Sequence, residues 1–114
     1  MDFKFTQDQN VLQSAIVDFL DKLPFDNAYW REKEEKSEWP IEFCTAMAEG
    51  GWLGALTPEE YGGAGLPIQA GAAILETIHQ SGCTAGACHA QMYTMGTVLR
   101  HGSAAQKSSF SHWL

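Results

Sequence analysis

Basic residues are scarce in this sequence. Its 114 residues include 7 Lys and Arg against 14 Asp and Glu, which gives a formal net charge of -7. A chain without a Lys/Arg cluster cannot neutralise many phosphates, so we expect no nucleic-acid partner. Long apolar runs are also interrupted: the uncharged stretch 61–74 contains five Gly or Pro residues. We therefore expect no membrane span.

Cysteines are few and unevenly spaced, at Cys44, Cys83 and Cys88. An odd number without a regular framework indicates free thiols in a reducing compartment. The first residues show neither the basic segment and apolar core of a secretory signal nor the Arg- and Ser-rich character of a transit peptide. We expect a cytoplasmic protein.

Alternation of apolar and polar residues, which is typical of a half-buried strand, does not extend over a useful length. Helical spacing is common instead, and two capping-box patterns, Thr6 with Gln9 and Ser103 with Gln106, indicate helix starts. The length allows one domain with a single core. We therefore predict an all-α, antiparallel helical domain of about five or six helices, with the longest segments at 7–22, 67–81 and 84–100.

Apolar side chains at helical spacing predict which helix faces are buried. Pro40 suits a first helical position, and the buried face that follows it is predicted to contain Ile41, Cys44, Met47 and Ala48. Segment 67–81 is apolar nearly all the way round, which predicts a central helix covered on several sides. The mixed-sign charges of residues 31–36 predict a solvated face.

The segment 57–66, TPEEYGGAGL, places three glycines in four positions between two predicted helices. The spacing Gly63-x-Gly65 lacks the third glycine of a dinucleotide-binding fingerprint, and no predicted strand precedes it. A rigid connector explains the segment better, because glycines allow positive φ and prolines fix the flanks. We expect no nucleotide site here.

Cysteine and histidine residues gather around the start of segment 84–100, at His79, Cys83, Cys88 and His89. Their spacing is not that of a zinc ribbon or finger. Adjacent residues on a helix point to different faces, which disfavours a Cys–His nucleophile. Buried thiols beside a helix-lining histidine are the better interpretation, so neither a metal site nor a catalytic residue is predicted.

Three stretches of the chain carry a family resemblance. The first is Phe5-Thr6-x-x-Gln9, the second runs from Trp39-Pro40 through AEGGWLG (48–54) to PEEYGGAGL (58–66), and the third is LRHGS-x-x-QK (99–107). In this order and spacing, the whole chain resembles the N-terminal helical domain of the flavin-dependent acyl-CoA dehydrogenases. The middle stretch is the most specific of the three.

This resemblance implies a homotetrameric oxidoreductase with an N-terminal helical domain, a middle β-domain and a C-terminal helical bundle. Such an enzyme uses FAD to remove a proton from Cα and a hydride from Cβ of an acyl-CoA, and passes electrons to an electron-transfer flavoprotein. The catalytic carboxylate and most flavin and CoA contacts belong to the two later domains. Residues 1–114 would then be the first domain alone, inactive and without bound FAD.

The resemblance also implies that the helix matching residues 84–100 helps to wall the acyl-chain cavity. Ala85, His89, Met92 and Gly96 follow helical spacing on one face, so they are the predicted substrate-binding residues. Small or flexible side chains leave volume for an acyl chain, and His89 could close one end as a polar stop. Alternatively, the same face packs tightly on the preceding helix.

Two other interpretations stay open. The chain could belong to a superfamily relative, such as an acyl-CoA oxidase or a flavin monooxygenase, which the sequence of the later domains would distinguish. It could also be a stand-alone helical interaction module, which a reading frame ending after Leu114 would indicate. Acyl chain length and electron acceptor cannot be read from these residues.

We predict that the 114-residue chain, produced alone, purifies without flavin. The resemblance assigns most flavin contacts to later domains, and the sequence has no complete dinucleotide fingerprint. An absorption spectrum of the purified protein checks this prediction, and a stoichiometric visible flavin band would contradict it.

Overall fold

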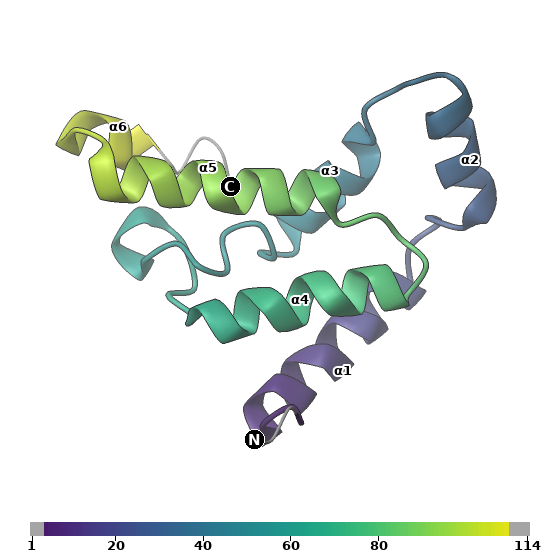
Figure 1. Ribbon diagram of the computed structural model, residues 1–114, viewed down its shortest axis with the longest axis horizontal. Coiled ribbons are helices and arrows are strands. Elements are labelled where there is room, and N and C mark those ends of the chain that lie inside the picture. Colours follow the sequence, from purple (N-terminus) through teal and green to yellow (C-terminus); the bar gives the residue numbers. More distant parts are fainter. Residues whose placement is uncertain (1–3, 110–114) are drawn as a thin grey trace.

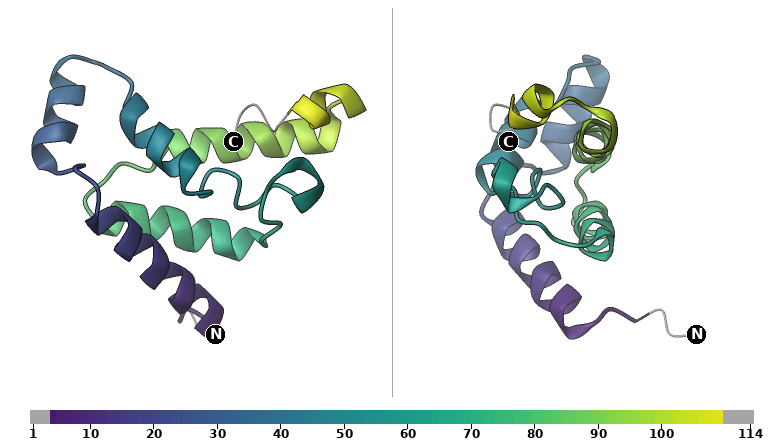
Figure 2. Two further views of the ribbon diagram at one scale, coloured as in Figure 1. Left: turned by 180° about the vertical axis from the view of Figure 1, so that it is seen from behind. Right: turned by 90° about the vertical axis from the view of Figure 1, so that its left-hand side faces the viewer.

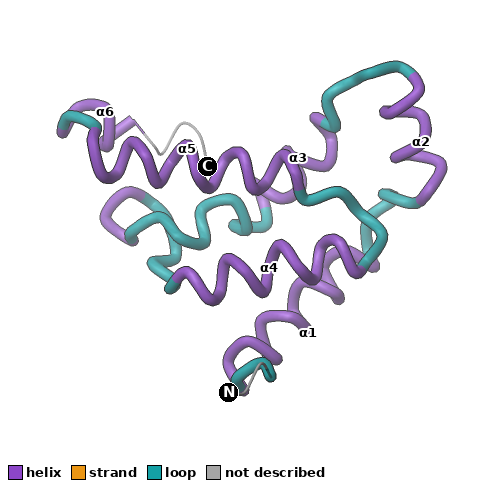
Figure 3. Tube along the Cα trace, in the orientation of Figure 1, coloured by secondary structure: helices purple, strands orange, loops and turns teal. Residues whose placement is uncertain are grey.

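The computed structural model describes residues 4–109, and the regular secondary structure of this part of the chain is helical, without strands (Figures 1 and 3). The segment between the third and fourth α-helices, residues 50–67, is called the connector below. It contains a 3-10 turn, η1 (Glu59–Tyr61). The predicted all-α class with five or six helices is confirmed. The α-helices are α1 (Gln7–Asp21), α2 (Asn27–Glu35), α3 (Ile41–Glu49), α4 (Ile68–Gln80), α5 (Gly86–His101) and α6 (Ala104–Ser108).

Both predicted capping boxes begin helices. At α1, the Thr6 hydroxyl accepts the Gln9 N–H at 3.2 Å, and the Gln9 side chain accepts the Thr6 N–H at 2.8 Å. Ser103 and Gln106 make the same reciprocal pair at α6. These bonds satisfy N–H groups that a helix start leaves without intrahelical partners, so the local sequence fixes where both helices begin.

The helices are arranged around the antiparallel pair α4 and α5 (Figure 1). Seen edge-on, α4 and α5 lie on one side of the molecule, and α1 lies with the connector on the other (Figure 2). α1 packs along α4, while α3 and α6 pack against α5. α4 and α5 do not pack closely on each other along their length, so α1 is the main helical partner of α4.

The core lies where α1, α3, α4 and the start of α5 meet the connector. Its buried residues are Ile16, Leu20, Phe43, Met47, Leu53, Ala55, Ile74, Ile78, Cys83, Ala85, Cys88 and Met92. Burial of this apolar surface is the main term holding the helices together. Cys83 and Cys88 are buried, as predicted, and all three cysteines are free thiols.

The predicted inner face of α3 is only partly right: Met47 is buried and Ala48 packs against the core, as predicted, but Phe43 takes the place expected for Ile41. Phe43 and Met47, one helical turn apart, point into the core and are fully buried, whereas Ile41 is 57% exposed. Because successive helical residues turn by about 100°, a residue two positions before Phe43 faces away from the core. Pro40, predicted as the first helical residue, is the N-cap, and α3 begins one position later at Ile41.

The prediction that the fourth helix is covered on several sides is also wrong. α4 buries Ile74, Thr77 and Ile78 against its neighbours, but Ile68 is 72% exposed and Ala72 is exposed. The cause is the wide separation of α5, which leaves one side of an apolar helix without a closely packed helix in the described part of the chain.

The charge run of residues 31–36 lies mostly on α2, which buries none of its residues, as a solvated face predicts. Lys33 nevertheless ties α2 to the start of α3, because its ammonium group lies 3.2 Å from Glu38 and 3.1 Å from Glu42. The Tyr29 hydroxyl donates to Glu42 at 3.0 Å and accepts the Phe43 N–H at 3.3 Å. These contacts hold α2 against α3.

The connector between α3 and α4 folds back on itself. The Ala64 N–H donates to Gly54 O at 3.0 Å, the Gly65 N–H to Thr57 O at 2.8 Å, and the Leu66 N–H to Ala55 O at 2.9 Å. A Cβ at Gly63 would overlap the Thr57 carbonyl, and Gly65 has a φ of 64°. The glycines therefore make a rigid connector possible, as predicted.

We predict that Gly63→Ala destabilises the protein more than Gly65→Ala does. Alanine at position 65 meets only ordinary contacts and pays for the left-handed backbone, about 1–2 kcal/mol. Alanine at position 63 forces the connector away from Thr57, so its cost should exceed about 3 kcal/mol. Urea unfolding followed by circular dichroism measures both, and an equal or smaller loss for Gly63→Ala would show that the connector is not tightly closed.

Candidate functional site

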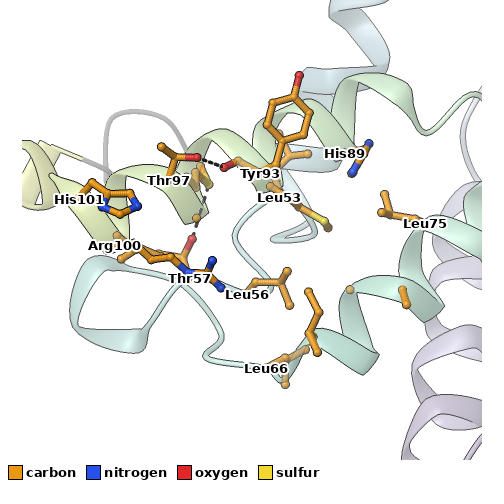
Figure 4. A pocket seen from close by; sticks show the side chains of 17 residues that line it. Leu53, Leu56, Thr57, Leu66, Leu75, His89, Tyr93, Thr97, Arg100 and His101 are labelled. Carbon is orange, nitrogen blue, oxygen red and sulfur yellow. Dashed lines mark hydrogen bonds between the residues drawn. The ribbon is translucent and has the colours of Figure 1, made fainter.

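A pocket of about 690 Å³ lies between α4 and α5 (Figure 4). The connector supplies its floor through Leu53, Leu56 and Leu66. The remaining lining residues are Thr57 of the connector, Ile68, Gly71, Ala72 and Leu75 of α4, and His89, Met92, Tyr93, Met95, Gly96, Thr97, Leu99, Arg100 and His101 of α5. The lining is mainly apolar, and a drug-sized or acyl-sized ligand commonly occupies a volume of this order.

Two glycines shape the walls of the pocket. A Cβ at Gly71 would lie 2.9 Å from Leu56 Cδ1, so the glycine lets the floor residue approach α4. A Cβ at Gly96 would meet nothing within 4 Å, so α5 is open to the pocket there. The connector therefore fills one side of the space between α4 and α5, and the space beside Gly96 stays empty.

Three of the four substrate-binding residues predicted from the sequence line this pocket. His89 is exposed and stacks edge-on against Tyr93, with 5.2 Å between ring centroids. Met92 is buried at the edge of the core, and Gly96 faces the open space. These positions bring one helix face to the pocket, while a role in binding an acyl chain stays a prediction.

Ala85 does not line the pocket. It is the N-cap of α5, is 1% exposed and packs in the core. Because α5 begins at Gly86 and not at the predicted residue 84, Ala85 lies beyond the helical part of the face and under the turn from α4. The alternative interpretation, in which this face packs tightly, therefore holds for Ala85. It does not hold for Gly96, where an added Cβ would meet no atom within 4 Å.

Sequence reasoning missed the connector leucines and the polar end of the pocket. Leu53, Leu56 and Leu66 lie outside regular helices, so no periodicity marked them. Arg100 is the one Lys or Arg residue among the lining residues. It is also the one Lys, Arg, Asp or Glu residue of α5, and this is a signal that the sequence did contain.

Cys88, the residue before the lining residue His89, is a buried thiol and is not suited to act as a nucleophile. Cys88 is 1% exposed, and burial together with the neighbouring Cys44 and Cys83 raises its pKa to about 12. It therefore stays protonated at neutral pH, and reactivity requires the thiolate. Within residues 4–109, no three His, Cys, Asp or Glu side chains are placed to hold a metal ion.

The glycine segment does not fit a flavin phosphate. The space that a side chain at Gly63 would take is occupied by the connector's own Thr57 carbonyl, so the missing side chain serves internal packing. A dinucleotide fingerprint needs glycines that open toward the ligand after a strand. Within this segment the 3-10 turn η1, and not a strand, comes directly before the glycines, and Pro67 comes before α4, so we assign FAD no site on it.

Comparison with known proteins identifies the family. The family model described as "Acyl-CoA dehydrogenase, N-terminal domain" matches residues 6–113. The chain belongs to this family. No helix within the described residues is long and apolar enough to cross a bilayer.

Relatives of this acyl-CoA dehydrogenase N-terminal domain are moderately similar. Glutaryl-CoA dehydrogenase of Desulfococcus multivorans is 31% identical over 96% of this chain and 29% of its own length. The 3-(aryl)acrylate reductase of Clostridium sporogenes (strain ATCC 15579) is 32% identical over 72% of this chain and 21% of its own length. Probable acyl-CoA dehydrogenase YdiO of Escherichia coli (strain K12) is 31% identical over 93% and 27%, respectively.

The chain thus spans less than a third of the length of these relatives. No solved structure gave a significant match. The family match agrees with the all-α domain seen in the structure.

We predict opposite stability changes for two substitutions on the predicted face. Ala85→Phe overfills the core and should lower the free energy of unfolding by about 1–3 kcal/mol. Gly96→Ala adds a methyl group to open space within a helix and should raise it by about 0.5–1 kcal/mol. Thermal and urea unfolding check both; destabilisation by Gly96→Ala would show that the pocket is closed at this point.

Proposed function

We propose that this chain is the first domain of an FAD-dependent acyl-CoA dehydrogenase and that the pocket between α4 and α5 forms part of the wall of the acyl-chain cavity. The observation that supports this most is the apolar pocket of about 690 Å³ on the family's N-terminal domain. Leu53, Leu56 and Leu75 offer hydrocarbon contacts there. Each CH₂ of an acyl chain buried against them contributes about 0.8 kcal/mol.

In this proposal, His89, Met92 and Gly96 act as substrate-contacting residues on α5. Met92 is flexible enough to adapt to an irregular chain, Gly96 supplies empty volume, and His89 limits one end with a polar ring. Ala85 supports α5 from the core. The resemblance places the catalytic carboxylate and most flavin contacts in the later domains, so the chain alone is expected to be inactive.

The rest of the proposal concerns the longer enzyme. FAD, bound by later domains, would supply the hydride acceptor, and an electron-transfer flavoprotein would remove the electrons. The exposed side of α4, with Ile68 uncovered, supports burial against further domains or subunits of a homotetramer. The three free cysteines support a cytoplasmic location.

A second candidate reaction is reduction of an unsaturated acid. It is favoured by the similarity to a protein named 3-(aryl)acrylate reductase, which covers 72% of this chain. The pocket accepts either direction of reaction, because an apolar wall recognises the hydrocarbon part and not the bond that changes. Activity assays in both directions separate the two.

The test is Gly96→Phe in the full-length enzyme. A phenyl ring on α5 would occupy the open space, so kcat/KM for the longest accepted acyl-CoA should fall at least about 10-fold, while shorter substrates change little. Flavin content should not change. The measurement is the acyl chain-length profile of kcat/KM.

Thr94→Phe is the matched control, because Thr94 is exposed on the same helix and does not line the pocket. It should leave the chain-length profile unchanged. If Gly96→Phe and Thr94→Phe give the same profile, the pocket is not part of the acyl cavity. If the enzyme turns over no acyl-CoA in either direction, the proposed activity itself is wrong.

A further inference from the structure

One end of the pocket is polar and cationic. Thr57 from the connector and Arg100 and His101 from the last turn of α5 line it, and no Asp or Glu occurs among the pocket-lining residues that the structure describes. This local balance is opposite to that of the whole chain, which has 14 acidic and 7 basic residues. An apolar pocket with a cationic end is suited to an amphipathic ligand.

Thr57 is an underused hydrogen-bond donor at this end. Its side chain lies in a residue that is 1% exposed, and its hydroxyl donates to Met95 Sδ at 3.5 Å. A thioether is a weak acceptor, and buried hydroxyls normally find oxygen or nitrogen partners. Thr57 is one of the lining residues, so a ligand oxygen that reached its hydroxyl would be a stronger partner than the thioether.

Arg100 completes the arrangement. It extends from α5 toward Thr57, and its guanidinium group points to the space between the helix and the connector (Figure 4). Lys33 and Lys36 are engaged in ion pairs, whereas Arg100 forms no ion pair with another described residue. His101 follows it at the same end of the pocket and adds a ring nitrogen.

We propose that Thr57, Arg100 and His101 form a subsite for an oxyanion carried by the ligand of this pocket. This inference rests on the proposed function, in which that ligand is an acyl-CoA. The oxyanion is either a carboxylate at the far end of the acyl chain or a phosphate of the CoA part. Arg binds both groups through charge-assisted hydrogen bonds, which are stronger than neutral ones.

The test compares two ligands of equal carbon number in the full-length enzyme. Hexanoyl-CoA ends in a methyl group and adipoyl-CoA ends in a carboxylate, so their dissociation constants differ through the terminal group alone. The variant is Arg100→Gln, at an exposed position where folding is not at risk. Arg31→Gln is the matched control, since Arg31 is exposed on α2 and does not line the pocket.

The expected result for a carboxylate is that Arg100→Gln weakens adipoyl-CoA binding about 10-fold and leaves hexanoyl-CoA binding unchanged. If the oxyanion is a CoA phosphate, both ligands weaken about equally. Arg31→Gln should weaken neither. A loss for adipoyl-CoA alone and an equal loss for both ligands each support an oxyanion subsite, and the difference between them identifies the group that binds there.

The proposal is overturned if both ligands bind the wild-type enzyme and Arg100→Gln behaves like Arg31→Gln. Arg100 would then only stabilise the C-terminal end of α5, where a cation is favourable in any case. If the wild-type enzyme binds neither ligand, the proposed acyl-CoA function fails, and the subsite that rests on it fails too.

Discussion

The backbone hydrogen bonds that close the connector hold the rest of the structure in place. Residues 54–57 receive the N–H groups of residues 64–66, which turns a glycine-rich segment into a rigid bridge between α3 and α4. This bridge carries Leu53 and Leu56 to the space between α4 and α5. Because the connector leucines lie between α4 and α5, the two antiparallel helices do not pack closely on each other, and a pocket remains.

The same constraint explains the uneven packing of α4. Its inner side meets α1 and the core through Ile74 and Ile78, while its other side keeps Ile68 exposed. The uncovered side of this apolar helix is surface that a further domain or subunit could bury.

The pocket joins two kinds of chemistry that arise from different elements. The floor and α4 are hydrocarbon. The one charged lining residue, Arg100, lies with His101 at the end of α5 and beside Thr57, whereas the neutral polar rings of His89 and Tyr93 lie nearer the start of that helix. The separation of the charged end from the apolar lining follows from helix geometry, because Met92 and Arg100 are two turns apart on α5.

The sequence by itself determined the class, most of the helices and the rigid connector, but not α2, where the charge run predicted only a solvated face. Capping boxes at Thr6 and Ser103 act through neighbours three residues away, and a backbone that needs glycine is a local requirement, so both are readable without the fold. The family resemblance followed from the same local patterns, and the family match confirms it.

Only the tertiary structure decided which faces are used. Ile41 and Phe43 look equally apolar in sequence, but the docking of α3 turns Phe43 inward. Ala85 and Gly96 share a predicted face, yet the turn after α4 buries Ala85 while the connector holds the space open beside Gly96. Burial depends on where distant segments pack, and that is settled by contacts between residues far apart in the chain.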